Sequence, residues 1–389
     1  SDPMLSLAPV FGLVDWVTGD AIVALNVVMF ALFVLALASA HALGRRILGR
    51  GDLALVVAVV ACCNSYVFGQ QNHPQLQTFG FVSLGFVVLF RAIEHRRGRD
   101  GVALGAVAVV LALANPLYAL IWGLAAATGV VVLALRRALP PLASLVRPAA
   151  AAAATAAVVL VPVGLVFLDV TVARPYEPAN SLLATDVLTP QRDNWLWGTA
   201  LDGVNSVGEP GEHAYFPGLL ALLLGAVGLA LLVRHWRGPA GPPVEAPVRI
   251  DELWAVVAGG AVALVLAVGP SPGGLPGPFR LFHRYVPGFD GVRVTSRFTV
   301  VTFVAAALLV GLAVGWLGRR LGPGARPWLA VAVAAVVVVE VAGPMRRVDV
   351  PEGDRLLVYE RLAELPAGAV VELPIRAPSE GAVWPFTEA

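Results

Sequence analysis

Long apolar segments recur along the whole chain, and this pattern constrains the fold more than any other feature of the sequence. A helix that crosses a bilayer needs about 20 mostly apolar residues. Of the 389 residues, 58% are hydrophobic and only 14% are charged, and the mean hydropathy is +0.79. Soluble domains carry roughly 25% charged residues, so a soluble fold would expose much apolar surface to water. The sequence therefore predicts an all-α transmembrane helical bundle.

About ten segments have the composition of membrane spans. They are Ala21–Leu43, Leu53–Phe68, Gln75–Ile93, Gly101–Ala114, Leu117–Leu135, Pro148–Leu168, Phe216–Val233, Leu253–Val268, Phe298–Leu317 and Trp328–Ala342. Pro116 lacks a backbone donor and disfavours helix at Asn115, so a hairpin turn is expected between the fourth and fifth segments. A single kinked span is the alternative, and it would reverse the orientation of every later segment.

Arginine marks every second connection between the predicted spans. The odd-numbered connections contain Arg45, Arg46, Arg50, Arg96, Arg97, Arg99, Arg136, Arg137, Arg147, Arg234, Arg237, Arg249, Arg319, Arg320 and Arg326. The even-numbered connections contain few arginines, except for Arg174 and Arg192 in the sixth and a cluster in the eighth. Because cytoplasmic loops retain arginine, the odd-numbered connections are expected in the cytoplasm. The hairpin alternative then gives one consistent topology, with both ends of this chain outside the cytoplasm.

Two domains are predicted. Residues 1–343 form the transmembrane domain, with long extracytoplasmic loops at 169–215 and 269–297, and residues 344–389 begin a small soluble α/β domain that is cut short. In that tail, residues 354–366 have apolar positions at helical spacing and residues 369–374 have the pattern of a buried strand. The leading segment Leu5–Val17 is expected to be an interfacial or re-entrant helix. Because the chain starts with Ser1, it is interpreted as a fragment.

Several familiar functional motifs are missing from the sequence. It contains no P-loop, no strand-embedded GxGxxG, no HExxH and no Cys/His metal-binding spacing, so ATP hydrolysis and a structural zinc site are unsupported. The net charge of +1 gives no reason to expect a nucleic-acid partner.

Polar residues at the predicted outer face are the candidates for chemistry. They are Asp2, Asp15 and Asp20 around the leading segment, His73 in the second connection, and Asp186 and His213 in the sixth. A carboxylate there could act as a general base toward an acceptor hydroxyl or hold a divalent cation. The alternative for each of them is a solvated loop charge.

The eighth connection is unusually basic for a loop outside the cytoplasm. It contains Arg280, His283, Arg293 and Arg297 beside the entry to a span. Guanidinium groups suit phosphate recognition, so these residues could bind a lipid-linked phosphate or diphosphate. The alternative is ion pairing with the acidic sixth connection or with lipid headgroups. Glu340 lies inside the last span, but only about one turn from its end, which favours a structural role.

Six short stretches carry a resemblance to a known superfamily. They are SDPMLSLAP at 1–9, before a span that contains Asn26; NHPQLQ at 72–77; the stretch from LTP at 188–190 to Trp197 and Gly198; YFPG at 215–218; PGFDGVRVTSRF at 287–298; and VVELP at 370–374. Together they span nearly the whole length of the chain. In these stretches the chain resembles bacterial membrane proteins of the GT-C glycosyltransferase superfamily, in particular the YfhO-like and related branches.

The resemblance implies an enzyme of the bacterial plasma (inner) membrane. Such an enzyme moves a sugar from a polyprenyl-phosphate donor to a glycan, lipid or protein acceptor outside the cytoplasm, with a carboxylate of the first external loop as base. Asp2 matches that position, and Asp15 and Asp20 are close alternatives. Two other functions stay open: a transporter or flippase of a lipid-linked intermediate, and a noncatalytic envelope assembly protein. Apolar span centres argue mildly against the transporter, because transporters place polar groups at mid-membrane.

Overall fold

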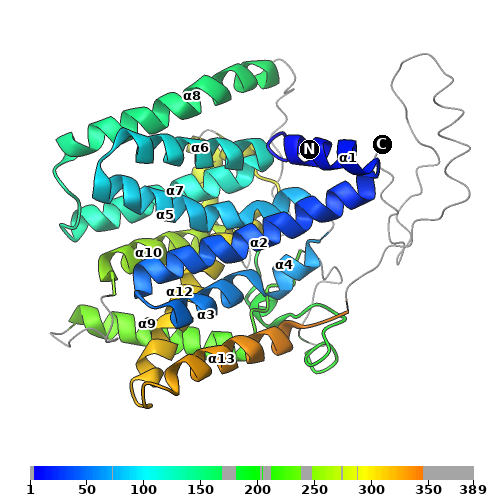
Figure 1. Ribbon diagram of the computed structural model, residues 1–389, viewed down its shortest axis with the longest axis vertical. Helices are drawn as coiled ribbons and strands as arrows, with labels where there is room; N and C mark the ends of the chain where they lie inside the picture. The colour runs from blue at the N-terminus through cyan, green and yellow to red at the C-terminus, as the bar shows by residue number, and fades with distance from the viewer. Residues whose placement is uncertain are drawn as a thin grey trace, which may run out of the picture. The chain divides into compact units, whose positions relative to one another are not determined.

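The computed structural model describes residues 4–71, 73–168, 181–201, 204, 212–237, 248–272, 275–286 and 288–344 (Figure 1). The chain divides into two compact units, residues 1–344 and residues 345–389. The second unit lies outside the described residues, and so do both elements that the sequence predicts there, the helix at 354–366 and the strand at 369–374. Every regular element in the described part of the first unit is a helix.

The α-helices follow the predicted segments closely. They are α1 (Ala8–Thr18), α2 (Ala21–Leu48), α3 (Gly51–Cys62), α4 (Ser65–Gly69), α5 (Gly80–His95), α6 (Gly98–Ala114), α7 (Pro116–Leu135), α8 (Val146–Leu168), α9 (Leu219–Arg237), α10 (Ile250–Ala267), α11 (Phe279–Tyr285), α12 (Thr299–Gly318) and α13 (Arg326–Val341). Short 3-10 turns precede or join them: η1 (Pro74–Phe79), η2 (Leu142–Leu145), η3 (Ala184–Leu188), η6 (Phe289–Gly291) and η7 (Thr295–Phe298). The long helices lie side by side, with α8 at one edge of the bundle and α13 at the other (Figure 1).

Seven of the described helical segments are long and apolar enough to cross a membrane. They cover 21–48, 74–95, 116–135, 142–166, 219–236, 250–267 and 295–318. The other three predicted spans form shorter helices, since α3, α6 and α13 have 12, 17 and 16 residues. The all-α membrane bundle is thus confirmed, whereas the count of ten spans stays a prediction.

The second predicted span, Leu53–Phe68, is interrupted. The helix α3 ends at Cys62, and Cys63 has an extended backbone. The side chain of Asn64 then accepts a hydrogen bond from the Val67 backbone N–H at 3.0 Å and starts α4. A polar capping residue inside an apolar run therefore breaks the helix, which hydropathy alone does not reveal.

A hairpin forms at Asn115 and Pro116, as the first of the two alternatives predicts. The Asn115 side chain accepts from Leu117 N at 3.1 Å and so caps α7. Its amide nitrogen reaches the Gln75 carbonyl at 3.4 Å, at the start of η1 and α5. The opposite end of α7 is joined to the start of α10 by the Arg136–Asp251 ion pair. The helices α6 and α7 therefore run in opposite directions, and the single kinked span is excluded.

The described residues of the five arginine-bearing connections lie at one end of the bundle, which we call the basic end. There Arg46 forms ion pairs with Glu94 and Glu252, both at 2.7 Å, and ties the end of α2 to α5 and α10. The other end, formed by the described residues of the ranges 63–80, 115, 181–218 and 268–298, we call the loop end. Its segments are joined by backbone hydrogen bonds such as Ser65 N to Phe216 O at 3.0 Å. The alternation of arginine in the sequence therefore corresponds to two distinct ends, and their orientation in the cell stays a prediction.

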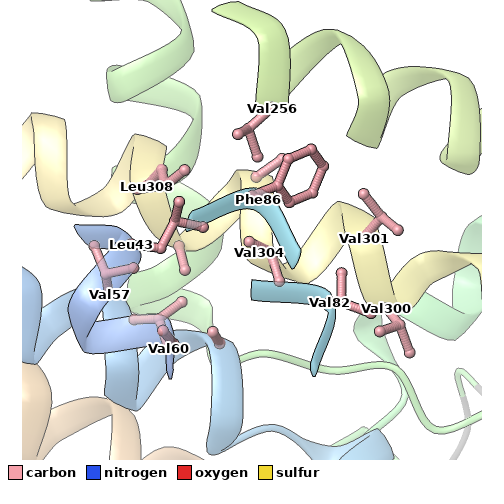
Figure 2. Packing of buried hydrophobic residues seen from close by; sticks show 14 of the residues in the cluster. Leu43, Val57, Val60, Val82, Phe86, Val256, Val300, Val301, Val304 and Leu308 are labelled. Carbon is pink, nitrogen blue, oxygen red and sulfur yellow. The ribbon is translucent and has the colours of Figure 1, made fainter. Parts of the chain in front are cut away.

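The helix α12 runs through the centre of the apolar core. Figure 2 shows side chains from α2, α3, α5, α10 and α12 meeting there; those labelled are Leu43, Val57, Val60, Val82, Phe86, Val256, Val300, Val301, Val304 and Leu308. Glycines let the neighbouring helices approach closely, as is usual between membrane helices. A Cβ at Gly228 of α9 would lie 2.0 Å from the Leu309 carbonyl oxygen, and one at Gly260 of α10 would lie 2.6 Å from the Ala305 Cβ.

The leading segment forms α1, a helix of 11 residues. It is too short to cross a bilayer, as the sequence predicts for this segment. Its outer face is strongly exposed, with 82% of Trp16 and 62% of Leu13 accessible. Leu7, just before α1, packs against Val28 and Leu32 of α2. The exposed aromatic and aliphatic face is typical of a helix that lies in the membrane interface.

Candidate functional site at the loop end

Three buried tyrosines meet at the loop end. Tyr66 lies in α4, Tyr118 in the first turn of α7, and Tyr215 just before α9, and all three are at most 1% exposed. The rings of Tyr66 and Tyr215 are stacked, with centroids 4.9 Å apart. The hydroxyl oxygens of Tyr66 and Tyr118 lie 3.2 Å apart, and Tyr118 donates to the Leu76 carbonyl at 3.2 Å. Residues from three distant parts of the chain thus form one polar cluster inside the bundle end.

A partly buried ion pair lies beside these tyrosines. Arg297 Nη2 is 2.5 Å from Glu212 Oε1, and Arg297 Nε is 3.4 Å from Glu212 Oε2. The two side chains are 16% and 18% exposed. Burial raises the pKa of the Tyr215 hydroxyl well above its ordinary value, Tyr66 and Glu212 raise it further, and the Arg297 charge lowers it. Tyr215 is therefore a neutral hydroxyl at physiological pH, close to one guanidinium group.

A second buried pair joins Asp186 and His213 in the sixth connection. His213 Nδ1 lies 2.9 Å from Asp186 Oδ2, and the two side chains are 5% and 1% exposed. The same carboxylate oxygen accepts from the Leu183 backbone N–H at 2.8 Å and fixes the start of η3. The Asp186 carbonyl also accepts from Tyr215 N at 3.1 Å. Asp186 therefore holds the imidazole, the loop and the tyrosine cluster together.

The structure brings some of the predicted residues together and leaves others apart. Asp186 and His213 contact each other, whereas Arg297 contacts Glu212 of the acidic sixth connection. For Arg297, the ion pair proposed as the alternative to phosphate binding is therefore what the structure shows. The pairing is possible because the sixth and eighth connections cover the same end of the bundle.

The remaining predicted binding residues lie on the surface or at its margin. Arg280 is exposed on α11 and donates to Ser271 Oγ at 2.7 Å. His283 is half-buried with its ring 5.9 Å from that of Phe279, and Arg293 is exposed. His73 is half-buried just before η1. Their roles in substrate binding stay predictions.

The three predicted catalytic carboxylates differ in their surroundings. Asp20 is exposed and caps α2, because its Oδ1 accepts from Ile22 N at 2.8 Å and from Val23 N at 3.0 Å. Asp15 is half-buried on α1, and Asp2 lies outside the described residues. A structural role thus accounts for Asp20, while the catalytic role of each carboxylate stays a prediction.

Sequence reasoning did not single out Tyr66 and Tyr118 as site residues. Each lies in an apolar segment, where a tyrosine resembles any other aromatic core residue. A signal was nevertheless present, because the chain has only six tyrosines and these two sit near the loop-end termini of predicted spans. The convergence with Tyr215 depends on the fold and could not be read from spacing.

Glu340 has the structural role that its position favours. Its carboxylate accepts from the backbone N–H groups of Leu219 and Leu220, at 3.1 and 3.0 Å, and caps the start of α9 from the neighbouring α13. Its carbonyl accepts from the Asn194 amide at 2.8 Å. Glu340 is only 6% exposed, so these hydrogen bonds satisfy a buried charge.

The described residues contain no group of three or more His, Cys, Asp and Glu side chains that could hold a metal ion. The Asp186–His213 pair offers two ligands at most. A divalent cation, considered from the sequence, therefore has no complete ligand set in this part of the chain.

A family model described as "6-pyruvoyl-tetrahydropterin synthase related domain; membrane protein" matches residues 9–208, more than half of the chain. The chain belongs to this family. The match includes Tyr66, Tyr118 and Asp186, and the family's membrane character agrees with the seven apolar helices. Comparisons with curated proteins and with solved structures gave no match. The family match and the helices together establish a multi-pass membrane protein, and membership of the GT-C superfamily stays a prediction.

Proposed function

We propose that this family member is a membrane glycosyltransferase that acts at the loop end and takes its sugar from a polyprenyl-phosphate donor. The observation that supports the proposal is the pair of buried charge contacts, Arg297–Glu212 and Asp186–His213, around a cluster of buried tyrosines. Buried ion pairs contribute little to stability, because the loss of hydration offsets their attraction. Ionisable groups inside a membrane protein are therefore functional candidates.

Phosphate recognition is assigned to the guanidinium group of Arg297. Its two-pronged contact with Glu212 has the geometry that a phosphate would also accept. In the proposed complex the donor phosphate replaces Glu212 as the partner of Arg297. The neutral hydroxyl of Tyr215, which is affected by the charge of Arg297, is assigned as the donor of a further hydrogen bond to that phosphate. Arg280 and Arg293, which are exposed, and His283, which is half-buried, lie in the same connection as Arg297 and are assigned to the approach of the donor.

The transfer itself needs a base for the acceptor hydroxyl. The base removes the hydroxyl proton, the oxygen attacks the anomeric carbon, and the bond from that carbon to the phosphate oxygen breaks. The resemblance assigns the base to a carboxylate, Asp2, Asp15 or Asp20. We include the imidazole of His213 as a further candidate: if Nδ1–H of a neutral ring donates to Asp186, Nε2 is the acceptor.

The test uses the full chain reconstituted in lipid nanodiscs with a radiolabelled polyprenyl-phosphate sugar. We expect donor consumption, with losses on the order of 100-fold for the variant that lacks the base. Asp2→Asn, Asp15→Asn, Asp20→Asn and His213→Gln distinguish the candidates. Asp20→Asn keeps the cap of α2 because asparagine caps as well as aspartate. Arg234→Gln, at the basic end, is the control. If the unaltered protein moves the donor across the bilayer without consuming it, a flippase replaces the transferase; if it neither binds nor consumes it, the proposal is wrong.

A further inference from the structure

Three arginines line a cavity at the basic end. Arg97, Arg99 and Arg147, together with Gly98, line about 260 Å³ where α6 and α8 begin. No described carboxylate forms an ion pair with any of the three arginines. The nearest acidic residue along α6, Asp100, is buried and instead faces Arg91 at 3.6 Å and His95 at 3.4 Å.

This arrangement differs from that of the neighbouring helices α2, α5 and α10 at the same end. There Arg46 and Arg249 pair with Glu94 and Glu252, and Arg136 pairs with Asp251. Three like charges that share one cavity repel one another, and a bound anion would remove that repulsion. The cavity therefore carries the positive charge expected of an anion site. No described acidic side chain supplies the matching negative charge.

The packing of α6 on α8 fixes the shape of the cavity. A Cβ at Gly98 would lie 3.4 Å from Arg147 Nε, so the Arg147 side chain lies beside the start of α6. Seven residues further on, a Cβ at Gly105 would lie 2.5 Å from the Ala152 carbonyl oxygen. The two helices thus start side by side and run in the same direction, and their arginines are held in one place.

The helix beside the cavity is accessible to lipid. Within residues 142–166, an apolar stretch of 18 residues has none of its residues buried inside the bundle. Val158 is 74% exposed, Leu165 60% and Val166 66%. A lipid whose phosphate lies among the three arginines can therefore place its acyl chains along α8, and a free phosphate would gain nothing from this surface.

We propose that Arg97, Arg99 and Arg147 form a binding site for the phosphate headgroup of an anionic phospholipid in the leaflet at the basic end. The site lies at the opposite end of the bundle from the proposed transfer site and does not depend on it. Each arginine near an anionic headgroup strengthens binding by about fivefold, so the three together contribute on the order of 100-fold.

The experiment measures lipid retention by native mass spectrometry on the full chain in neutral detergent, titrated with phosphatidylglycerol or with phosphatidylcholine. We expect preferential binding of phosphatidylglycerol, and its loss by at least about tenfold in the triple variant Arg97→Gln, Arg99→Gln, Arg147→Gln. The control variant Arg45→Gln, Arg137→Gln, Arg234→Gln removes the same charge from exposed positions of the same end and should keep the binding.

A second variant distinguishes the effect of the cavity's shape from the effect of its charge. Gly98→Leu keeps all three arginines and fills the start of α6, so it should also weaken retention of phosphatidylglycerol. Equal retention by the triple variant and the control variant would overturn the proposal. Displacement of the lipid by millimolar inorganic phosphate would assign the site to a free anion and would also overturn it.

Discussion

The buried carboxylate of Glu340 offers the sharpest test of the packing, because one side chain caps a helix that begins more than 100 residues earlier. The Glu340→Ala substitution leaves the N–H groups of Leu219 and Leu220 without their acceptor at a position that is 6% exposed. An unsatisfied buried donor costs about 1–3 kcal/mol. Loss of two donors, partly relieved by rearrangement at the helix start, should lower the free energy of unfolding by about 3 kcal/mol.

The conservative variant divides this effect into its parts. Glu340→Gln keeps one acceptor oxygen but places an amide N–H₂ beside the second backbone donor and removes the charge that favours the helix start. It should cost about 1–2 kcal/mol, between the unaltered protein and Glu340→Ala. Val339→Ala is the matched control, because Val339 is 60% exposed on the same helix turn.

Gly218 allows the contact itself to be tested. Its φ of +98° favours glycine, and a Cβ there would lie 2.8 Å from Glu340 Oε2. Gly218→Ala should therefore destabilise the protein, and by less when Glu340 is already alanine, because only the backbone strain then remains.

The assay is unfolding in mixed detergent micelles with increasing SDS, followed by tryptophan fluorescence. A cost of Glu340→Ala within about 0.5 kcal/mol of the Val339→Ala cost would refute the capping argument. Strict additivity of Gly218→Ala and Glu340→Ala would show that the two residues do not interact.

Three further predictions concern Arg297, Asp20 and Tyr215. Arg297→Ala leaves Glu212 partly buried and unpaired, so it should lower the free energy of unfolding in the same SDS titration by at least about 1 kcal/mol. The double variant Arg297→Ala, Glu212→Ala should recover part of this loss. Equal costs of the single and the double variant would contradict the ion pair. Asp20→Ala should lower the free energy of unfolding by about 1 kcal/mol because the cap of α2 is lost, whereas Asp20→Asn should lower it by only a few tenths. A large loss of stability in Asp20→Asn would refute the capping role. Because the folded-state pKa of Tyr215 is raised, the stability linked to this group is fully present below the ordinary tyrosine pKa of about 10 and falls as pH rises above it. Unfolding titrations between pH 9 and 11 should show a shallower decline for Tyr215→Phe, and an unchanged slope would contradict the raised pKa.

Local sequence rules were sufficient for the helices and the two ends of the bundle. All ten segments predicted from apolar runs lie on helices in the structure. The Asn115–Pro116 pair predicted a hairpin, and the structure shows it with Asn115 capping α7. The span count was less secure, because Asn64 ends the apolar run of α3 by capping α4 and a hydropathy window averages over that single polar residue.

The pairings at the loop end lay beyond those rules. Arg297 and Glu212 are separated by 85 positions, and Asp186 and His213 by 27, so their contacts depend on how two long connections cover the bundle. The sequence identified Asp186, His213 and Arg297 as unusual, but it left the partner of Arg297 open between a phosphate and an acidic loop. Only the tertiary structure places Glu212 beside it.

The distribution of charge between the two ends has a consequence for where lipids and substrates can bind. Charged side chains of the described helices lie near the helix ends, and the centre around α12 is apolar, so an ionic ligand is accommodated only at the ends. At the loop end Arg297 is partly buried and paired with Glu212, so a phosphate must displace Glu212 to reach Arg297. At the basic end Arg97, Arg99 and Arg147 face a cavity with no described carboxylate bound to them, so a phosphate binds there without displacing one. Binding at the loop end should therefore be more selective than binding at the basic end, because a ligand must form contacts strong enough to offset the loss of the Arg297–Glu212 contact.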